Sequence, residues 1–299
     1  LTITSGVSGE SLSLTGSGVL GAASAGTQTV TNNNTLAISN GTGLASNYTL
    51  SGATINVTVI PRALNVTLSR EYDGTTVVSG ASLTPTFDSL QGGETLALSG
   101  TGSVSTANVG SSKAVTLGTI ALAAGSGNPN NYTLNTANMN VTQRVINLDG
   151  IRAYDATTNV LSSDITTFGN IVSGETLTIS GTGSVGTNSV AMNKTITTGS
   201  LALGNGSGLA SNYTLTGGTH TFDISPVSVN VTGNRQYDGT NVIDSSDLLL
   251  TNLLTGETVS LSGQGTVVSA DVGANKTVTS VNLALTGANA GNYTLNSYT

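Results

Sequence analysis

Recurring carboxylates are the residues of this chain that could do chemistry, because a pair of carboxylates is what glycoside hydrolysis requires. One set follows glycine in a repeated Gly-Glu pair: Glu10, Glu94, Glu175 and Glu257. A second set lies in a Y-D-[GA]-T motif: Asp73, Asp155 and Asp238. Asp73 and Glu94 could form such a pair. Tandem identical active sites are uncommon, however, and the chain has no Trp to line sugar subsites. We therefore expect no enzyme activity and no catalytic residue.

The residue types present give little support for metal binding or for nucleophilic catalysis. Calcium takes six to eight oxygen ligands, usually including several carboxylates, and no D-x-D-x-D cluster is present. We expect no cofactor and no transition metal, with calcium at the three motif aspartates as the remaining option. The absence of Cys excludes disulfides and thiolate ligands. His220 is the only histidine, and its threonine neighbours predict an exposed strand position.

A lysine follows the glutamate by 19 residues in three places, at Lys113, Lys194 and Lys276. Gln28 holds the corresponding place near the N-terminus. Such a lysine could form an isopeptide cross-link with a neighbouring Asn. We favour an ordinary Lys–Glu surface ion pair, which contributes about 0–1 kcal/mol to stability.

These markers recur in one order, which indicates tandem repeats of a little over 80 residues. The segment N-Y-T-L occurs four times, with Tyr48, Tyr132, Tyr213 and Tyr293. The predicted repeats span residues 1–60, 61–142, 143–225 and 226–299. The first lacks its opening segment, and the last ends before the strand that "INVTVI" supplies at residues 55–60. The sequence therefore predicts a fragment of a longer array.

Alternating apolar and polar residues predict strands with one buried face. Leu64, Val66 and Leu68 alternate with polar residues, and similar alternation marks residues 95–98, 114–122, 195–203, 227–231 and 258–262. "SGTGSV", at residues 99–104 and 180–185, predicts hairpins. Residues 245–254 and their counterparts predict an adaptable edge or loop. The expected fold is all-β, with tandem Ig-like β-sandwich repeats of about 82 residues forming an elongated rod. A β-solenoid is the alternative.

The recurring residues have a structural interpretation. A Tyr at a strand entry can bury its ring and bond its hydroxyl to nearby backbone, as in the tyrosine corner of sandwiches. Asp-Gly is a turn dipeptide. The expected turn residues are Tyr72, Asp73, Gly74, Tyr154, Asp155, Tyr237, Asp238 and Gly239. Ala156 replaces the glycine in the third repeat, which predicts that a positive φ is not obligatory there. The alternative role for the N-Y-T-L tyrosines is carbohydrate stacking.

Charge and hydropathy restrict the partners. The net charge is −7 and no Lys/Arg run is present, which argues against nucleic acid and anionic membranes. No apolar run is long enough to span a bilayer as a helix. The Asn that begins each N-Y-T-L segment is also the first residue of an N-x-T glycosylation sequon. Sugars could therefore be attached at Asn47, Asn131, Asn212 and Asn292.

The Y-D-G-T turn, the G-E-T-L segment, the N-K-T-V strand and the N-Y-T-L segment together resemble the YDG repeats of large bacterial surface and secreted proteins. Those repeats occur in exoproteins similar to the filamentous-haemagglutinin, two-partner-secretion class. The resemblance covers essentially the whole chain. It implies Gram-negative export, a large parent protein and no catalytic residues. Ala156 and Gln28 depart from the motifs.

We therefore expect a structural repeat module of an extracellular adhesin, stalk or fibre at the bacterial cell surface. Its partners would be neighbouring repeats, like chains in a fibre, or host glycans. The alternative function is a multivalent glycan- or protein-binding module, which should repeat one exposed patch.

Overall fold

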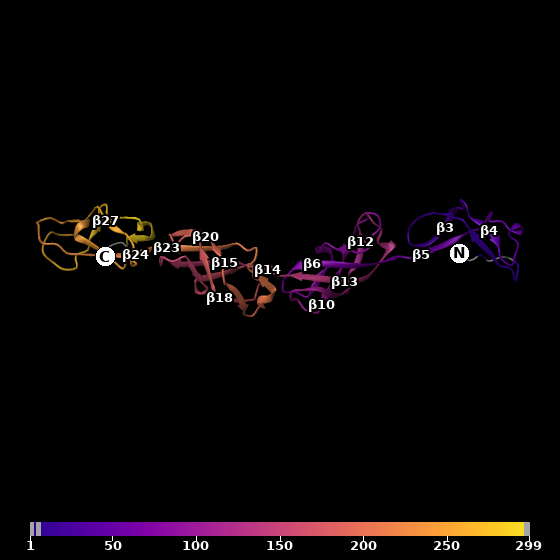
Figure 1. Cartoon of the computed structure of the whole chain (residues 1–299), viewed down its shortest axis with the longest axis horizontal. Coiled ribbons are helices and arrows are strands. Elements are labelled where there is room, and N and C mark those ends of the chain that lie inside the picture. The colour runs from indigo at the N-terminus through magenta and orange to yellow at the C-terminus, as the bar shows by residue number, and fades with distance from the viewer. Residues whose placement is uncertain (1–2, 4–6, 296–299) are drawn as a thin grey trace. The chain divides into compact units, whose positions relative to one another are not determined.

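The computed structural model describes residue 3 and residues 7–295, and this part of the protein is all-β. Within it, no helix reaches seven residues, and none has the length and apolarity needed to cross a membrane. The chain divides into two compact units, residues 1–142 and 143–299, and each contains two predicted repeats (Figure 1). Residues 1, 2, 4–6 and 296–299 of the first and last predicted repeats lie outside the described residues.

The second repeat contains a complete set of strands, from the opening strand to the closing strand. These are β6 (Arg62–Glu71), β7 (Val77–Ser79), β8 (Thr86–Phe87), β9 (Leu96–Ser99), β10 (Thr101–Val104), β11 (Gly110–Thr116), β12 (Ala121–Ala124) and β13 (Tyr132–Thr142), with the 3-10 turns η2 (Gly80–Ser82) and η3 (Pro129–Asn131). Six strands form a curled half-barrel sheet in the order β7-β10-β11-β13-β6-β8, and β9 pairs with β12. The opening strand β6 and the closing strand β13 run parallel, whereas the other pairs are antiparallel.

The third repeat has the same topology. Its elements are β14 (Arg144–Val145), β15 (Asn147–Ala153), β16 (Asn159–Leu161), η4 (Ser162–Asp164), β17 (Ile165–Gly169), β18 (Leu177–Ser180), β19 (Thr182–Val185), β20 (Ala191–Thr197), β21 (Ala202–Asn205), η5 (Ala210–Asn212), β22 (Tyr213–Thr214) and β23 (His220–Ser225). The half-barrel sheet has the order β16-β19-β20-β23-β15-β17. The opening strand is interrupted between β14 and β15, and these parts pair parallel with β22 and β23.

The first and fourth repeats have smaller sheets. The first contains β1 (Leu12–Thr15), β2 (Val19–Leu20), β3 (Gly26–Asn32), β4 (Ala37–Asn40), η1 (Ala45–Asn47) and β5 (Asn56–Val59). The fourth contains β24 (Val227–Gly233), β25 (Val242–Asp244), η6 (Ser245–Asp247), β26 (Leu248–Thr251), β27 (Ser260–Ser262), β28 (Gln264–Thr266), β29 (Thr279–Ser280), β30 (Ala284–Thr286), η7 (Ala290–Asn292) and β31 (Tyr293–Leu295). Its sheets are β26-β24-β31, β25-β28-β29 and β27-β30.

The core follows the predicted alternation. In β6, Leu64, Val66 and Leu68 are buried, and the polar residues between them are exposed, so this prediction is confirmed. The closing strand β13 adds Met139 and Val141 to the same core. Each such side chain contributes roughly 1.5–3 kcal/mol by leaving water, so the paired strands β6 and β13 carry much of the stability of the repeat.

The hairpins predicted at residues 99–104 and 180–185 are wrong. β9 pairs with β12, whereas β10 pairs with β7 and β11, so the chain passes from one sheet to another at Gly100. Gly100 has φ of 75° and Gly181 has φ of 89°. A Cβ on Gly100 would lie 2.0 Å from the backbone oxygen of Thr119. The glycine is needed for a left-handed backbone at a close contact, which local sequence cannot distinguish from a hairpin turn.

Two further strand predictions have different outcomes. Residues 114–122 and 195–203 each contain parts of two strands, with a turn at Gly118 or Gly199, where φ is 55°. A single strand across either range is therefore wrong. The segment at 245–254 forms the turn η6 and the strand β26. Like its counterparts β8 and β17, β26 lies at the edge of its sheet, so the predicted edge is confirmed.

Candidate functional site

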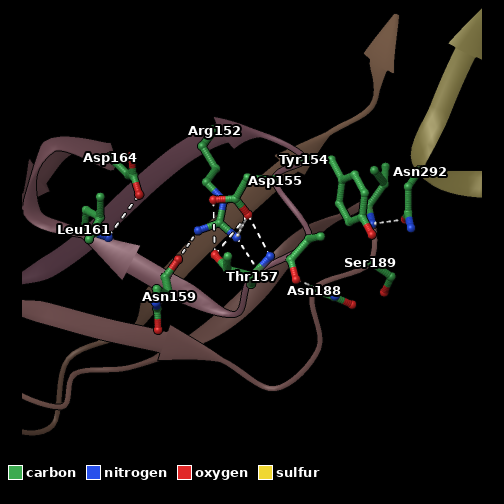
Figure 2. Close-up of polar contacts among 12 residues, drawn as sticks. Arg152, Tyr154, Asp155, Thr157, Asn159, Leu161, Asp164, Asn188, Ser189 and Asn292 are labelled. Atoms are coloured by element: carbon green, nitrogen blue, oxygen red, sulfur yellow. Dashed lines mark hydrogen bonds and ion pairs between the residues drawn. The ribbon is translucent and has the colours of Figure 1, made fainter. Parts of the chain in front are cut away.

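The Y-D-[GA]-T motif forms a tight turn closed by an arginine. In the third repeat, Oδ1 of Asp155 accepts from the backbone N–H of Thr157 at 2.9 Å and lies 2.8 Å from Nη2 of Arg152. The guanidinium also donates to the backbone oxygens of Thr157 and Asn159 (Figure 2). The carbon at its centre lies 5.5 Å from the centroid of the Phe222 ring. Arg152 therefore joins the turn to the closing strand.

The same turn is present in the second and fourth repeats. Asp73 lies 3.1 Å from Arg70, and Asp238 lies 2.8 Å from Arg235. The backbone N–H of Thr240 donates to Asp238 at 2.9 Å, and this hydrogen bond holds the pKa of Asp238 below its usual value. Each motif aspartate is thus engaged within its own turn.

Ala156 occupies a left-handed backbone position. Its φ is 62°, close to the 76° of Gly74 and the 81° of Gly239. The prediction that this turn does not require a positive φ is therefore wrong. A Cβ is disfavoured in this region by about 1–2 kcal/mol, so the bonds from Asp155 and Arg152 must hold Ala156 in place.

Each N-Y-T-L tyrosine is placed beside the glutamate of its own repeat. The Tyr132 hydroxyl donates to Glu94 Oε2 and accepts from the backbone N–H of Gln91 at 3.2 Å. The bond to Glu94 raises the pKa of Tyr132. The other copies make matching bonds: Tyr48 to Glu10, Tyr213 to Glu175 at 2.6 Å and to the N–H of Val172 at 3.2 Å, and Tyr293 to the N–H of Leu254 at 3.2 Å.

Sequence reasoning missed the Tyr–Glu bond. The available signal was a constant separation of 38 residues between the two partners in the first three repeats. The glycines before N-Y-T-L make room for it. A Cβ on Gly127 would lie 2.9 Å from a carboxylate oxygen of Glu94, and one on Gly208 would lie 2.4 Å from Glu175. The recurring G-x-G thus permits close approach of two backbone segments.

The lysines do not bind the glutamates. Lys113 donates to Thr106 at 2.9 Å, and Lys194 donates to Thr187 at 2.8 Å and to the backbone oxygen of Ser189 at 3.0 Å. Lys276 binds the backbone oxygen of Ser269 at 2.8 Å in the same way. The predicted Lys–Glu pairs are therefore wrong. In the second and third repeats the lysine holds the loop that precedes its own strand, β11 or β20. In the first repeat, Gln28 donates to Ser24 at 3.0 Å.

His220 is buried, so its predicted exposed position is wrong. It lies at the start of β23 with 7% of its surface exposed. Nδ1 accepts from the backbone N–H of Leu148 at 3.2 Å, and Nε2 lies 2.9 Å from the oxygen of Leu215. The tautomer that satisfies both partners carries its hydrogen on Nε2. Because both ring nitrogens of His220 have hydrogen-bond partners, this polar side chain can be buried at a position that the sequence predicted to be exposed.

The third and fourth repeats meet through the recurring motif residues. The hydroxyl of Tyr154 donates to Glu257, and its ring packs edge-to-face on Tyr293 with centroids 5.8 Å apart and planes at 79°. Across the same junction, Oδ1 of Asn292 in the fourth repeat accepts from the backbone N–H of Val190 in the third repeat at 2.9 Å (Figure 2). We call these five residues the junction cluster. It combines the tyrosine of one Y-D motif with the Glu, Asn and Tyr of the next repeat.

Burial dominates the electrostatics of the junction cluster. Tyr154 is 3% exposed. Its pKa is raised to about 12, mainly because the phenol is removed from water and secondly because it donates a hydrogen bond to Glu257. Burial also raises the pKa of Tyr293. Both phenols are therefore neutral at physiological pH, and Tyr154 is able to donate to the carboxylate.

The first and second repeats share one of these contacts. Asn131 accepts from the backbone N–H of Ala25 at 2.8 Å, as Asn292 accepts from Val190. In contrast, the equivalent tyrosine of the last Y-D motif, Tyr237, is 67% exposed. Tyr154, at the junction of the third and fourth repeats, is thus buried, whereas Tyr237 is exposed among the described residues.

The sequon asparagines differ in exposure. Asn47 is exposed and Asn131 is half-buried, whereas Asn212 and Asn292 are buried. A sugar on the buried amides would have to displace packed neighbours. Three of the four N-Y-T-L rings, those of Tyr132, Tyr213 and Tyr293, are also buried. Of the described residues, no three or more of the types His, Cys, Asp and Glu gather into a group that could hold a metal ion.

Comparison with family models identifies a YDG domain at residues 60–139 and 224–299. These segments hold 80 and 76 residues, or 156 of the 299 in the chain. They fall on the predicted second and fourth repeats. Comparison with curated proteins and with solved structures gave no match.

Proposed function

Because the chain belongs to the YDG domain family, we propose that it is a structural repeat module of an extracellular bacterial adhesin, stalk or fibre. In this proposal, each repeat is an Ig-like β-sandwich domain and the repeats extend end to end as a rod at the cell surface. The module is not an enzyme and needs no cofactor. Its principal partners are neighbouring repeats of the same chain.

The junction cluster is the observation that carries this proposal. The side chains that recur along the chain could have lined a repeated binding surface. Instead, Tyr154, Glu257 and Asn292 bond across one junction, and the motif aspartates and arginines bond within their turns. A multivalent binder would repeat an exposed aromatic or polar patch, whereas three of the four N-Y-T-L rings are buried. This use of the motif residues supports a role in joining repeats.

Short connections within each unit support a stiff array. Only Ile60 and Pro61 separate β5 from β6, and only Pro226 separates β23 from β24. Proline fixes φ and removes a hydrogen-bond donor, and no Gly/Ser linker intervenes. Consecutive repeats of this kind have little freedom to fold back on each other, as a spacer requires.

Small-angle scattering on the full chain tests the proposal. We expect the distance distribution of a stiff rod in which each repeat adds roughly 30–40 Å, from strands of about 10 residues at 3.3 Å each. Tyr154→Ala should broaden that distribution by loosening one junction, whereas Tyr237→Ala should leave it unchanged. A compact particle, or specific binding to a glycan array that Tyr237→Ala abolishes, would instead support the binding-module alternative.

A further inference from the structure

The junction cluster holds two oxidisable side chains in contact. Tyr154 and Tyr293 belong to different repeats, and their rings pack edge-to-face with centroids 5.8 Å apart. The two residues are 3% and 6% exposed, so the packing around them keeps the pair together. Holding two reacting groups in contact turns a bimolecular step into an intramolecular one and makes it much faster. A radical formed on either ring therefore has a second phenol against it from the start.

A carboxylate lies beside this pair. The hydroxyl of Tyr154 donates to Oε1 of Glu257. The other carboxylate oxygen of Glu257, Oε2, is buried and has no hydrogen-bond partner among the described residues. Burial raises the pKa of Tyr293 first, and Glu257 raises it further, which places the same carboxylate near the second phenol. Because a base must lie within hydrogen-bond reach of the proton that it takes, Glu257 is positioned to accept the proton of Tyr154.

The carboxylate matters because a phenol is oxidised more easily when it loses its proton in the same step. Without a base, removal of an electron leaves a strongly acidic radical cation. With a base on the hydroxyl, the proton leaves together with the electron, and the product is a neutral phenoxyl radical. Tyr154 thus combines two requirements for radical coupling: a base on its hydroxyl and a second phenol against its ring.

We propose that Tyr154 and Tyr293 form an oxidative cross-linking site, at which a one-electron oxidant joins the third and fourth repeats through a carbon–carbon bond. Each phenol loses one electron and its proton, and Glu257 takes the proton of Tyr154. The two phenoxyl radicals couple at the carbons ortho to their oxygens. The two ortho hydrogens then move to the oxygens and restore both hydroxyls.

The oxidant accounts for the electrons and protons that the pair loses. Two electrons pass to a high-valent metal oxidant, such as the haem of a peroxidase supplied with hydrogen peroxide. The peroxide takes up these electrons and two protons and leaves as two water molecules. The electrons cross the protein, so the oxidant does not have to touch the buried rings. This inference does not depend on the proposed function.

Peptide mapping of the oxidised full chain tests the cross-link. The probe is photoexcited tris(bipyridine)ruthenium with persulfate, a one-electron metal oxidant, applied to dilute protein, and the monomer is then isolated by size exclusion. Trypsin cuts after Arg152, Lys194 and Lys276, which releases Tyr154 in residues 153–194 and Tyr293 in residues 277–299. We expect these two peptides to be linked, at the sum of their masses less two hydrogen atoms. Fragmentation should place the bond at Tyr293 and not at Tyr298.

Matched variants assign the two rings. Tyr154→Phe and Tyr293→Phe should each abolish the linked peptide, whereas Tyr237→Phe, at a 67% exposed site, should leave its yield unchanged. Absence of the linked peptide from the unmodified chain, a bond at Tyr298, or a product that survives in either junction variant would overturn the proposal.

The rate of cross-linking tests the part assigned to Glu257. Glu257→Gln keeps an oxygen acceptor but removes the base, so the rate should fall by about tenfold or more. The rate of the unmodified chain should also fall in D₂O, because a proton moves with the electron. A rate that is the same in D₂O and in water would overturn the role of Glu257 even if the substitution loosened the junction.

Discussion

The third and fourth repeats share their motifs, yet within the described residues the third has a continuous six-stranded sheet and the fourth has three smaller sheets. The Asp–Arg turn and the lysine-held loop are formed in both. The cores differ in burial: Val160 and Val185 are 0% and 4% exposed, whereas their counterparts Ile243 and Val267 are 9% and 8% exposed. The turn and the loop therefore keep the same local contacts whether or not the described sheet around them is continuous.

Removing the aromatic anchor of the closing strand should make the third repeat resemble the fourth. Phe222 is fully buried in β23 and contacts Arg152. We expect Phe222→Ala to lower the free energy of unfolding of this repeat by about 3–5 kcal/mol. Hydrogen exchange should show lost protection in residues 191–197. Val281→Ala, at a 65% exposed site in the fourth repeat, is the control and should change stability by less than about 0.5 kcal/mol.

The stability of the junction between the third and fourth repeats should depend on the hydroxyl of Tyr154. Tyr154→Phe removes the donor to the Glu257 carboxylate, and we expect a loss of about 1–3 kcal/mol. This loss of stability is measured by urea unfolding, with hydrogen exchange of residues 284–295 as the probe. Tyr237→Phe changes the equivalent exposed tyrosine and should have no effect. Equal effects of the two substitutions would contradict the role assigned to the junction cluster.

Alkaline pH should weaken the same junction. The pKa of Tyr154 is raised from 10 to about 12 in the folded chain because the phenol is buried and bonded to Glu257. A raised pKa favours the neutral form, so its stabilisation is complete below pH 10 and is lost as the pH rises toward 12. Thermal melting across this range should show the decline, and Tyr154→Phe should reduce its slope. An unchanged slope in the variant would assign the decline to other groups.

The smallest expected effect concerns the turn of the third repeat. Ala156→Gly places the preferred residue at a left-handed position, so we expect a gain of about 0.5–1 kcal/mol. The reciprocal change, Gly74→Ala, should cost a similar amount in the second repeat. Denaturant midpoints of the two variants give both values, and a loss on Ala156→Gly would show that the turn is not strained.

The predictable part of the fold was the part encoded in short-range alternation. Leu64, Val66 and Leu68 face the core because a strand places every second side chain on one side. The passage between sheets at Gly100 was not predictable in this way. A left-handed glycine serves a hairpin and a sheet change equally, and the choice depends on strand partners far away in the sequence.

The site residues show the same limit. Their types and spacing were evident, but their partners were not. Glu94 is bound by Tyr132 rather than by Lys113, because folding brings the tyrosine hydroxyl to the carboxylate and directs the ammonium to its own loop. His220 is buried because backbone groups of Leu148 and Leu215 satisfy both ring nitrogens. Such pairings are properties of the tertiary structure.

The parallel pairing of the opening and closing strands determines how a repeat would bear load. In the second repeat, β6 and β13 pair from Arg62 and Tyr132 through to Glu71 and Thr142. The chain enters at one end of this pair and leaves at the other. Tension along the chain would therefore pull the two strands past each other lengthwise, so their hydrogen bonds would resist in concert instead of opening one by one. Such a repeat would resist shear.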